Sequence, residues 1–192
     1  MIEQLLEFDE TLFLFLNNLG SESWDGLWRF ITEKTSSIPL YALLLYLVYR
    51  KLGWKGTLIV MLCAAAMIAV TDQVSQFFKH GVQRPRPCQV EELKEIMRYA
   101  AKRCGRYGYF SGHASSSMAT AVFLGLLLKS SYKYLPFLML FWAVIIAYSR
   151  VYLGVHYPLD IITGMFFGGI VGWLFYLLQK RLQSRFNFSA IA

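Results

Sequence analysis

Charged residues are scarce in this sequence, and its first 28 residues contain neither lysine nor arginine. Only 16% of the 192 residues are charged while 56% are hydrophobic, and the mean hydropathy of +0.43 excludes an ordinary soluble domain. Because a signal peptide begins with basic residues, the acidic start argues against a cleavable one. The carboxylates form no cluster suited to Mg²⁺ or Zn²⁺, so we expect no metal and no cofactor. The composition indicates a single-domain integral membrane protein.

Five apolar segments approach the length of about 20 residues that a membrane-spanning helix needs. They lie at about residues 36–52, 56–78, 112–130, 134–150 and 158–179. In the last segment Gly164, Gly168 and Gly172 recur every four residues, a spacing that lets two helix backbones approach closely. We therefore predict an all-α polytopic membrane helix bundle over residues 35–186, followed by a C-terminal tail at 187–192.

Residues 1–34 have a different pattern. Apolar side chains recur at helical spacing from Leu5 to Leu19, with acidic residues on the opposite face. This pattern favours an amphipathic helix on the membrane surface, followed by a second short helix. A sixth span is the alternative, but it would carry four acidic residues into the bilayer at about 3 kcal/mol each. In total we expect five to six helices in the membrane.

The basic residues predict the orientation of the bundle. Lysine and arginine gather at 50–55, 129–133 and 180–185, which share one side of a five-span bundle and indicate the cytoplasmic side. The N-terminus, segment 79–111 and the turn at 150–157 then share the outer side. Segment 79–111 is also basic, but we attribute several of its cations to ligand binding. The net charge of +7 fits basic loops and an anionic ligand better than nucleic acid.

Three groups of polar residues fall on this predicted outer side. They are Lys79 with Arg86-Pro87, then Ser111-Gly112-His113, and finally Ser149-Arg150 with His156 and Asp160. Arginine presents forked donors that match phosphate oxygens, lysine adds a point charge, and the free N–H groups at the start of a helix bind anions. Taken singly, each residue also fits an interfacial or structural role. Together they predict a site for a multiply charged phosphate.

His156 and Asp160 have the spacing of a catalytic pair. They are four residues apart, so the carboxylate of Asp160 can accept the Nδ1 proton of His156. The Nε2 atom is then unprotonated and can act as a nucleophile, with His113 available as general acid. The third histidine, His80, we interpret as structural or interfacial.

The three cysteines have different surroundings. Cys63 lies in an apolar run and is predicted to be a small core residue. Cys88 and Cys104 both lie in the long polar segment. They either form a disulfide, if that segment faces an oxidising compartment, or remain free thiols.

The polar groups resemble the motifs of the type 2 phosphatidic acid phosphatase superfamily, the lipid phosphate phosphatases. The first motif is Lys, six residues and Arg-Pro, the second is Pro-Ser-Gly-His, and the third is Ser-Arg, five residues, His, three residues and Asp. The matching residues are Lys79, Arg86-Pro87, Ser111-Gly112-His113, Ser149-Arg150, His156 and Asp160. Phe110 stands where the family usually has proline, at a position that shapes the turn and contributes no catalytic atom.

The resemblance implies a metal-independent membrane phosphatase with a phosphohistidine intermediate. His156 would attack phosphorus, Asp160 would hold its tautomer, and His113 would protonate the leaving oxygen and later activate water. The groups that would bind the phosphate and stabilise its transition state are Lys79, Arg86, Ser111, Gly112 and Arg150.

The motifs identify the phosphate but not the lipid. We expect undecaprenyl pyrophosphate or lipid A as the substrate, at the outer face of a bacterial inner membrane, with phosphatidylglycerol phosphate and phosphatidic acid as alternatives. Five cations in segment 88–110 favour a large polar headgroup and hence lipid A: Lys94, Arg98, Lys102, Arg103 and Arg106. A non-catalytic lipid-binding protein is the competing class, although both motif histidines and Asp160 are present. Vanadate-dependent haloperoxidases share the phosphate pocket but are soluble.

Overall fold

The computed structural model describes residues 2–185, which contain helices and an isolated β-bridge but no strand. The helices longer than one turn are α1 (Ile2–Asn18), α2 (Glu22–Thr32), α3 (Ile38–Val82), α4 (Glu91–Lys94), α5 (Gly112–Leu128), α6 (Leu135–Tyr152) and α7 (Pro158–Arg185). Short 3₁₀ turns precede α3 (Lys34–Ser37) and α4 (Pro87–Gln89). The prediction of an all-α bundle is confirmed, and the predicted tail at 187–192 lies outside the described residues.

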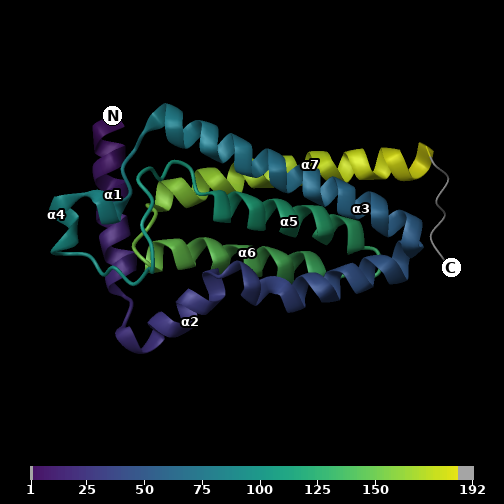
Figure 1. Cartoon of the computed structure of the whole chain (residues 1–192), viewed down its shortest axis with the longest axis horizontal. Helices are drawn as coiled ribbons and strands as arrows, with labels where there is room; N and C mark the ends of the chain where they lie inside the picture. Colours follow the sequence, from purple (N-terminus) through teal and green to yellow (C-terminus); the bar gives the residue numbers. More distant parts are fainter. Residues whose placement is uncertain (1, 186–192) are drawn as a thin grey trace.

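The helix α3 consists of two limbs that turn back on each other at Gly53. Its φ of 65° and ψ of −176° are not helical, and this backbone region favours glycine. Figure 1 shows the first limb running to the far end of the bundle and the second limb returning beside α7. The two limbs correspond to the first two predicted spans, 36–52 and 56–78.

The apolar helices fit a membrane-spanning bundle. Three helical segments are long and apolar enough to cross a bilayer, Lys34–Val82, Leu135–Tyr152 and Pro158–Arg185, and α5 is a shorter apolar helix. Large apolar side chains such as Leu62, Phe77 and Phe166 are exposed on the outside of the bundle. Exposed apolar surface on this scale is what lipid contact requires.

The central helix α5 packs against α6, α7 and α3 (Figure 1). A Cβ atom at Gly164 would lie 2.6 Å from the carbonyl oxygen of Ser111, and Cβ atoms at Gly168 and Gly172 would overlap the backbone of the next two turns of α5. The predicted packing role of these three glycines is therefore confirmed. Because α5 and α7 touch backbone to backbone, the residues at their first turns have little freedom to separate.

The helix α1 lies across one end of the bundle (Figure 1). Its buried face consists of Asp9, Phe13 and Asn17, one residue per turn, while Phe8 and Phe15 are exposed. We predicted that the acidic residues would share a solvated face, and for Asp9 this was wrong. The residue is only 3% exposed, and it pairs with a largely buried arginine that is described below. Contact of the exposed apolar face with the membrane surface stays a prediction.

Asn17 anchors the end of α1. Its side-chain amide donates to the carbonyl oxygens of Arg98, Val151 and Tyr152 at 3.0 Å and accepts from the Arg98 backbone at 2.7 Å. These four bonds connect α1 to the loop before α5 and to the end of α6. The N-terminal helix is thus an integral part of the fold at this end.

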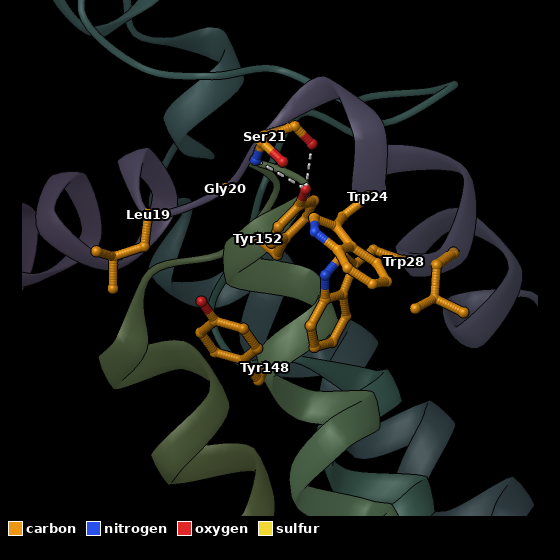
Figure 2. Close-up of a pocket in the computed structure, with 8 residues that line it drawn as sticks. Leu19, Gly20, Ser21, Trp24, Trp28, Tyr148 and Tyr152 are labelled. Atoms are coloured by element: carbon orange, nitrogen blue, oxygen red, sulfur yellow. Dashed lines mark hydrogen bonds between the residues drawn. The ribbon is translucent and has the colours of Figure 1, made fainter.

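The junction between α1 and α2 is fixed to α6 by aromatic side chains (Figure 2). The ring of Trp28 lies 5.1 Å from that of Tyr148 and 5.0 Å from that of Tyr152. The Tyr152 hydroxyl donates to the Ser21 carbonyl at 2.7 Å and accepts from the Ser21 N–H at 3.2 Å. These residues line an open pocket of about 350 Å³ together with Leu19, Gly20, Trp24 and Leu27.

Candidate active site

The three predicted motifs meet at the end of the bundle that α1 covers (Figure 1). Lys79 lies in the last turn of the second limb of α3, and Arg150 lies in the last turn of α6. Ser111 is the N-cap of α5, so Gly112 and His113 form its first turn. His156 lies in the link between α6 and α7, and Asp160 is in the first turn of α7. All eight predicted catalytic and phosphate-binding residues therefore belong to this end of the protein.

His156 and Asp160 form the predicted pair. The Nδ1 atom of His156 lies 3.2 Å from Oδ2 of Asp160, and the side chains are 2% and 0% exposed. The same carboxylate oxygen accepts from the backbone N–H of Tyr157 at 3.1 Å. Because Nδ1 is engaged by the carboxylate, Nε2 is the ring nitrogen left for a substrate.

The surroundings of His156 keep its imidazole neutral. Burial is the main cause that holds the pKa of His156 well below its ordinary value, and the positive charges of Arg86, Arg150 and Lys79 act in the same direction. A hydrogen bond with the backbone of Gly108 opposes them only in part. A neutral imidazole carries the lone pair that nucleophilic attack requires, so these surroundings suit a nucleophile.

The cations retain donors for an anion. The side chain of Arg150 donates from Nη1 to Thr32 Oγ1 at 2.6 Å, but its buried Nε has no hydrogen-bond partner among the described residues. Lys79 Nζ contacts Ser75 Oγ at 3.2 Å, and the pKa of Arg86 is lowered mainly by burial. A buried donor without a partner, such as Arg150 Nε, is costly unless a ligand completes it. This arrangement fits a phosphate group.

His113 lies among the same charged groups as His156. It interacts with Arg150, His156 and Lys79, so both histidines face the same cluster of positive charge. Ser111 caps the helix by accepting from the Ala114 N–H at 3.5 Å, and its own N–H donates to the Asp160 carbonyl at 3.0 Å. The start of α5 is thereby tied to the start of α7.

Two short segments of the long loop pair beside the site. The Arg86 N–H donates to the Arg106 carbonyl at 3.2 Å, and the Gly108 N–H donates to the Arg84 carbonyl at 2.9 Å. The Arg86 side chain also donates from Nε to the Tyr107 carbonyl at 2.9 Å. Next to this pairing, Cys88 and Cys104 form a disulfide with their Cα atoms 6.3 Å apart, which is the first of the two predicted alternatives. The disulfide and the backbone pairing fix the position of Arg86.

Gly108 is a site residue that the sequence analysis missed. A Cβ atom there would lie 3.0 Å from Asp160 Oδ2 and 3.2 Å from Arg86 Cγ. No signal in the sequence distinguished this glycine from others in the loop. Because Gly108 has no side chain, the loop backbone can lie directly against His156 and Asp160.

Replacing Gly108 with alanine is expected to lower the rate of phosphate release on the order of 10- to 100-fold, because the new methyl group displaces the Asp160 carboxylate. The rate at saturating substrate measures this effect. Gly81→Ala is the matched control, since a Cβ at Gly81 would meet no atom within 4 Å. Equal rates for Gly108→Ala and the wild type would show that the loop does not constrain the pair.

Arg84 is a second residue that the sequence analysis missed. Its Nη1 donates to Asp160 Oδ1 at 3.3 Å, and its Nη2 lies 2.8 Å from Asp9 Oδ2. The guanidinium carbon is 3.9 Å from the centre of the Tyr157 ring. Arg84 stands two residues before Arg86 in an Arg-Pro-Arg-Pro run, and this repetition was the available signal.

The cations of segment 88–110 are not equally available to a ligand. The Arg98 side chain pairs with Asp25 at 3.0 Å, and Lys94 pairs with Glu91 at 2.7 Å. The expectation that Arg98 and Lys94 engage a headgroup is therefore weakened. Lys102, Arg103 and Arg106 are exposed.

Comparison with known proteins identifies relatives of this chain. Residues 54–184 match the model of the PAP2 superfamily. A lipid A 4'-phosphatase of Bacteroides thetaiotaomicron is 35% identical over 96% of this chain and 83% of its own length. An undecaprenyl-diphosphatase of Sulfolobus acidocaldarius is 31% identical over 90% of this chain and 79% of its own.

The fold is also similar to that of a solved structure. The crystal structure of a transmembrane PAP2-type phosphatidylglycerolphosphate phosphatase from Bacillus subtilis superposes with a TM-score of 0.73. The superposition covers 93% of this chain and 87% of that one, at 16% identity. The chain belongs to the PAP2 superfamily and is a membrane phosphatase that acts on a lipid.

Proposed function

We propose that this protein removes the 4'-phosphate of lipid A at the outer face of a bacterial inner membrane. The observation that carries the proposal is the geometry around His156. Its Nδ1 is held by Asp160 at 3.2 Å, and the positive charges of Arg86, Arg150 and Lys79 act on its ring. The similarity to the lipid A 4'-phosphatase of Bacteroides thetaiotaomicron, over 96% of this chain, supports the choice of lipid.

The proposed reaction has two steps. The His156 Nε2 lone pair attacks phosphorus, the bond from phosphorus to the lipid oxygen breaks, and His113 gives its proton to that oxygen. Water then attacks phosphorus, His113 takes a proton from it, and the bond from phosphorus to Nε2 breaks to release inorganic phosphate. Charge builds on the phosphoryl oxygens in both steps, and Lys79, Arg86 and Arg150 stabilise it. The backbone amides at the start of α5 add further donors.

Two observations support an outer-face location. The opposite end of the bundle contains the turn at Gly53 and the ends of α5 and α7, next to the basic residues at 50–55, 129–133 and 180–185. Such residues are enriched on the cytoplasmic side. The site end contains the Cys88–Cys104 disulfide, and disulfides persist in oxidising compartments such as the periplasm.

Undecaprenyl pyrophosphate is the second candidate substrate, because the Sulfolobus acidocaldarius relative is an undecaprenyl-diphosphatase at 31% identity. The deciding experiment offers the detergent-purified protein lipid A, undecaprenyl pyrophosphate, phosphatidylglycerol phosphate and phosphatidic acid without added metal. We expect phosphate release from lipid A, with mass spectrometry and partial acid hydrolysis locating the loss at the 4'-position. Release from undecaprenyl pyrophosphate alone would replace the first candidate with the second. Release from none would reject both.

Changing Lys102 and Arg103 together to alanine is expected to raise the KM for lipid A about tenfold and to leave that for phosphatidic acid nearly unchanged. Both residues are exposed in the loop that leads to Gly108 and Ser111, and each exposed charge contributes only a few tenths to about 1 kcal/mol. The KM values of the two lipids in mixed micelles measure the effect. Lys129→Ala with Lys133→Ala, at the opposite end, is the matched control. Equal shifts for both lipids would remove these residues from headgroup recognition.

A further inference from the structure

The Asp160 carboxylate uses its two oxygens for different partners. Its Oδ2 faces His156 Nδ1, while its Oδ1 accepts from Arg84 Nη1 at 3.3 Å. The carboxylate is fully buried, and a buried charge is costly unless another charge and hydrogen bonds compensate for it. Arg84 supplies that charge on the side of Asp160 that faces away from His156.

Arg84 is itself held in place by α1. Its Nη2 lies 2.8 Å from Asp9 Oδ2, and both side chains are largely buried, at 15% and 4% exposed. The other carboxylate oxygen of Asp9 accepts from the Leu159 N–H at 2.8 Å, one residue before Asp160. Asp9 therefore binds both Arg84 and the first turn of α7. The Tyr157 ring covers the guanidinium, which limits its movement further.

These contacts form a continuous chain of groups from α1 to the nucleophile: Asp9, Arg84, Asp160 and His156. We propose that Arg84, fixed by Asp9, is a positioning residue that orients the Asp160 carboxylate toward His156, so that the N-terminal helix is part of the catalytic apparatus. The inference rests on the proposed phosphatase reaction of His156 and holds for whichever lipid is the substrate.

The alternative is that the Asp9–Arg84 pair only attaches α1 to the bundle. Asn17 already attaches α1 with four hydrogen bonds, so loss of the Asp9–Arg84 pair leaves the helix a second anchor. The matched control is Asp25→Asn. Asp25 pairs with Arg98 at 3.0 Å and attaches α2 to the same loop, but it does not contact Asp160.

Measurements of kcat and KM distinguish a positioning role of Arg84 from a mere attachment of α1 to the bundle. Arg84→Gln is expected to lower kcat on the order of 10- to 100-fold and Asp9→Asn about threefold to tenfold, each with KM within about twofold of the wild type. Asp9→Glu, which keeps the charge, should recover most of the rate. Because Arg84 acts through the carboxylate, Arg84→Gln in an Asp160→Asn background should cause almost no further loss. If the double variant showed the product of the two single-variant losses in kcat, the proposal would be overturned.

A measurement without substrate keeps this test separate from the identity of the lipid. The protein contains three histidines, His80, His113 and His156, so ¹⁵N spectra of histidine-labelled protein are simple to assign. We expect the His156 signal of a ring protonated at Nδ1 in the wild type and in Asp25→Asn, and a mixture of tautomers in Arg84→Gln. Unchanged His156 signals in Arg84→Gln would overturn the proposal even if lipid A proves not to be the substrate.

Discussion

Phosphate release is expected to fall by a factor on the order of 10⁴ or more when His156 is replaced by alanine, because the proposed covalent step has no other nucleophile. His156 is buried beside three cations, and the proposed mechanism depends on its ring being neutral. The rate of release from the substrate lipid measures the loss. Rapid acid-free quenching with ³²P-labelled lipid should capture a phosphohistidine in the wild type and none in the variant.

His80→Ala is the matched control for this substitution. His80 neighbours Lys79 in the sequence but is exposed on α3, and it should retain nearly full activity. Because loss of a buried ring also leaves a cavity, His156→Gln provides a second variant that keeps a polar side chain of similar length. Turnover above a few per cent of the wild-type rate in a folded His156 variant would reject the nucleophile assignment.

Asp160→Asn has the second largest expected effect, a fall in kcat on the order of 10³-fold with little change in KM. The amide keeps the shape of the side chain but not its charge, so His156 loses the acceptor that fixes its tautomer and that stabilises the imidazolium formed during phosphoryl transfer. The Tyr157 N–H donates to Oδ2 and Arg84 donates to Oδ1, and the amide keeps only one oxygen to accept from them. Single-turnover and steady-state rates with the substrate lipid separate the chemical step from binding.

A lipid-binding assay completes the Asp160 experiment. Binding of the lipid to Asp160→Asn in nanodiscs should match the wild type, since the side chains that the Asp160 carboxylate contacts are those of His156 and Arg84. Asp25→Asn should be normal in both assays. If Asp160→Asn lost binding and kept its rate at saturation, Asp160 would have a role in substrate attachment instead.

The contact between His156 and Asp160 and the local helix features could be predicted from the sequence because the residues involved are near each other in the chain. His156 and Asp160 are four residues apart, and the caps and first turns of α5 and α7 follow from local sequence. The two limbs of α3 and the glycine contacts of α7 also follow from hydrophobic and small-residue periodicity. Local rules were sufficient for all of these.

The supporting residues could not be predicted because their partners are remote. Arg84 and Asp160 are 76 residues apart, and Asp9 and Leu159 are 150 apart. An acidic residue on an amphipathic helix is normally solvated, so nothing local identified Asp9 as buried. The same reason applies to Arg98, whose pairing with Asp25 depends on where α2 lies.

The backbone contact between α5 and α7 fixes the distance between the first turns of these two helices. His113 stands on one helix and Asp160 on the other, and Gly168 meets the backbone of Ser115, two residues beyond His113. The separation of His113 from Asp160 is therefore set by close backbone packing that the absence of a side chain at Gly168 permits. A side chain at Gly168 would push the two helices apart and so move His113 relative to Asp160, although Gly168 is itself none of the predicted phosphate-binding residues.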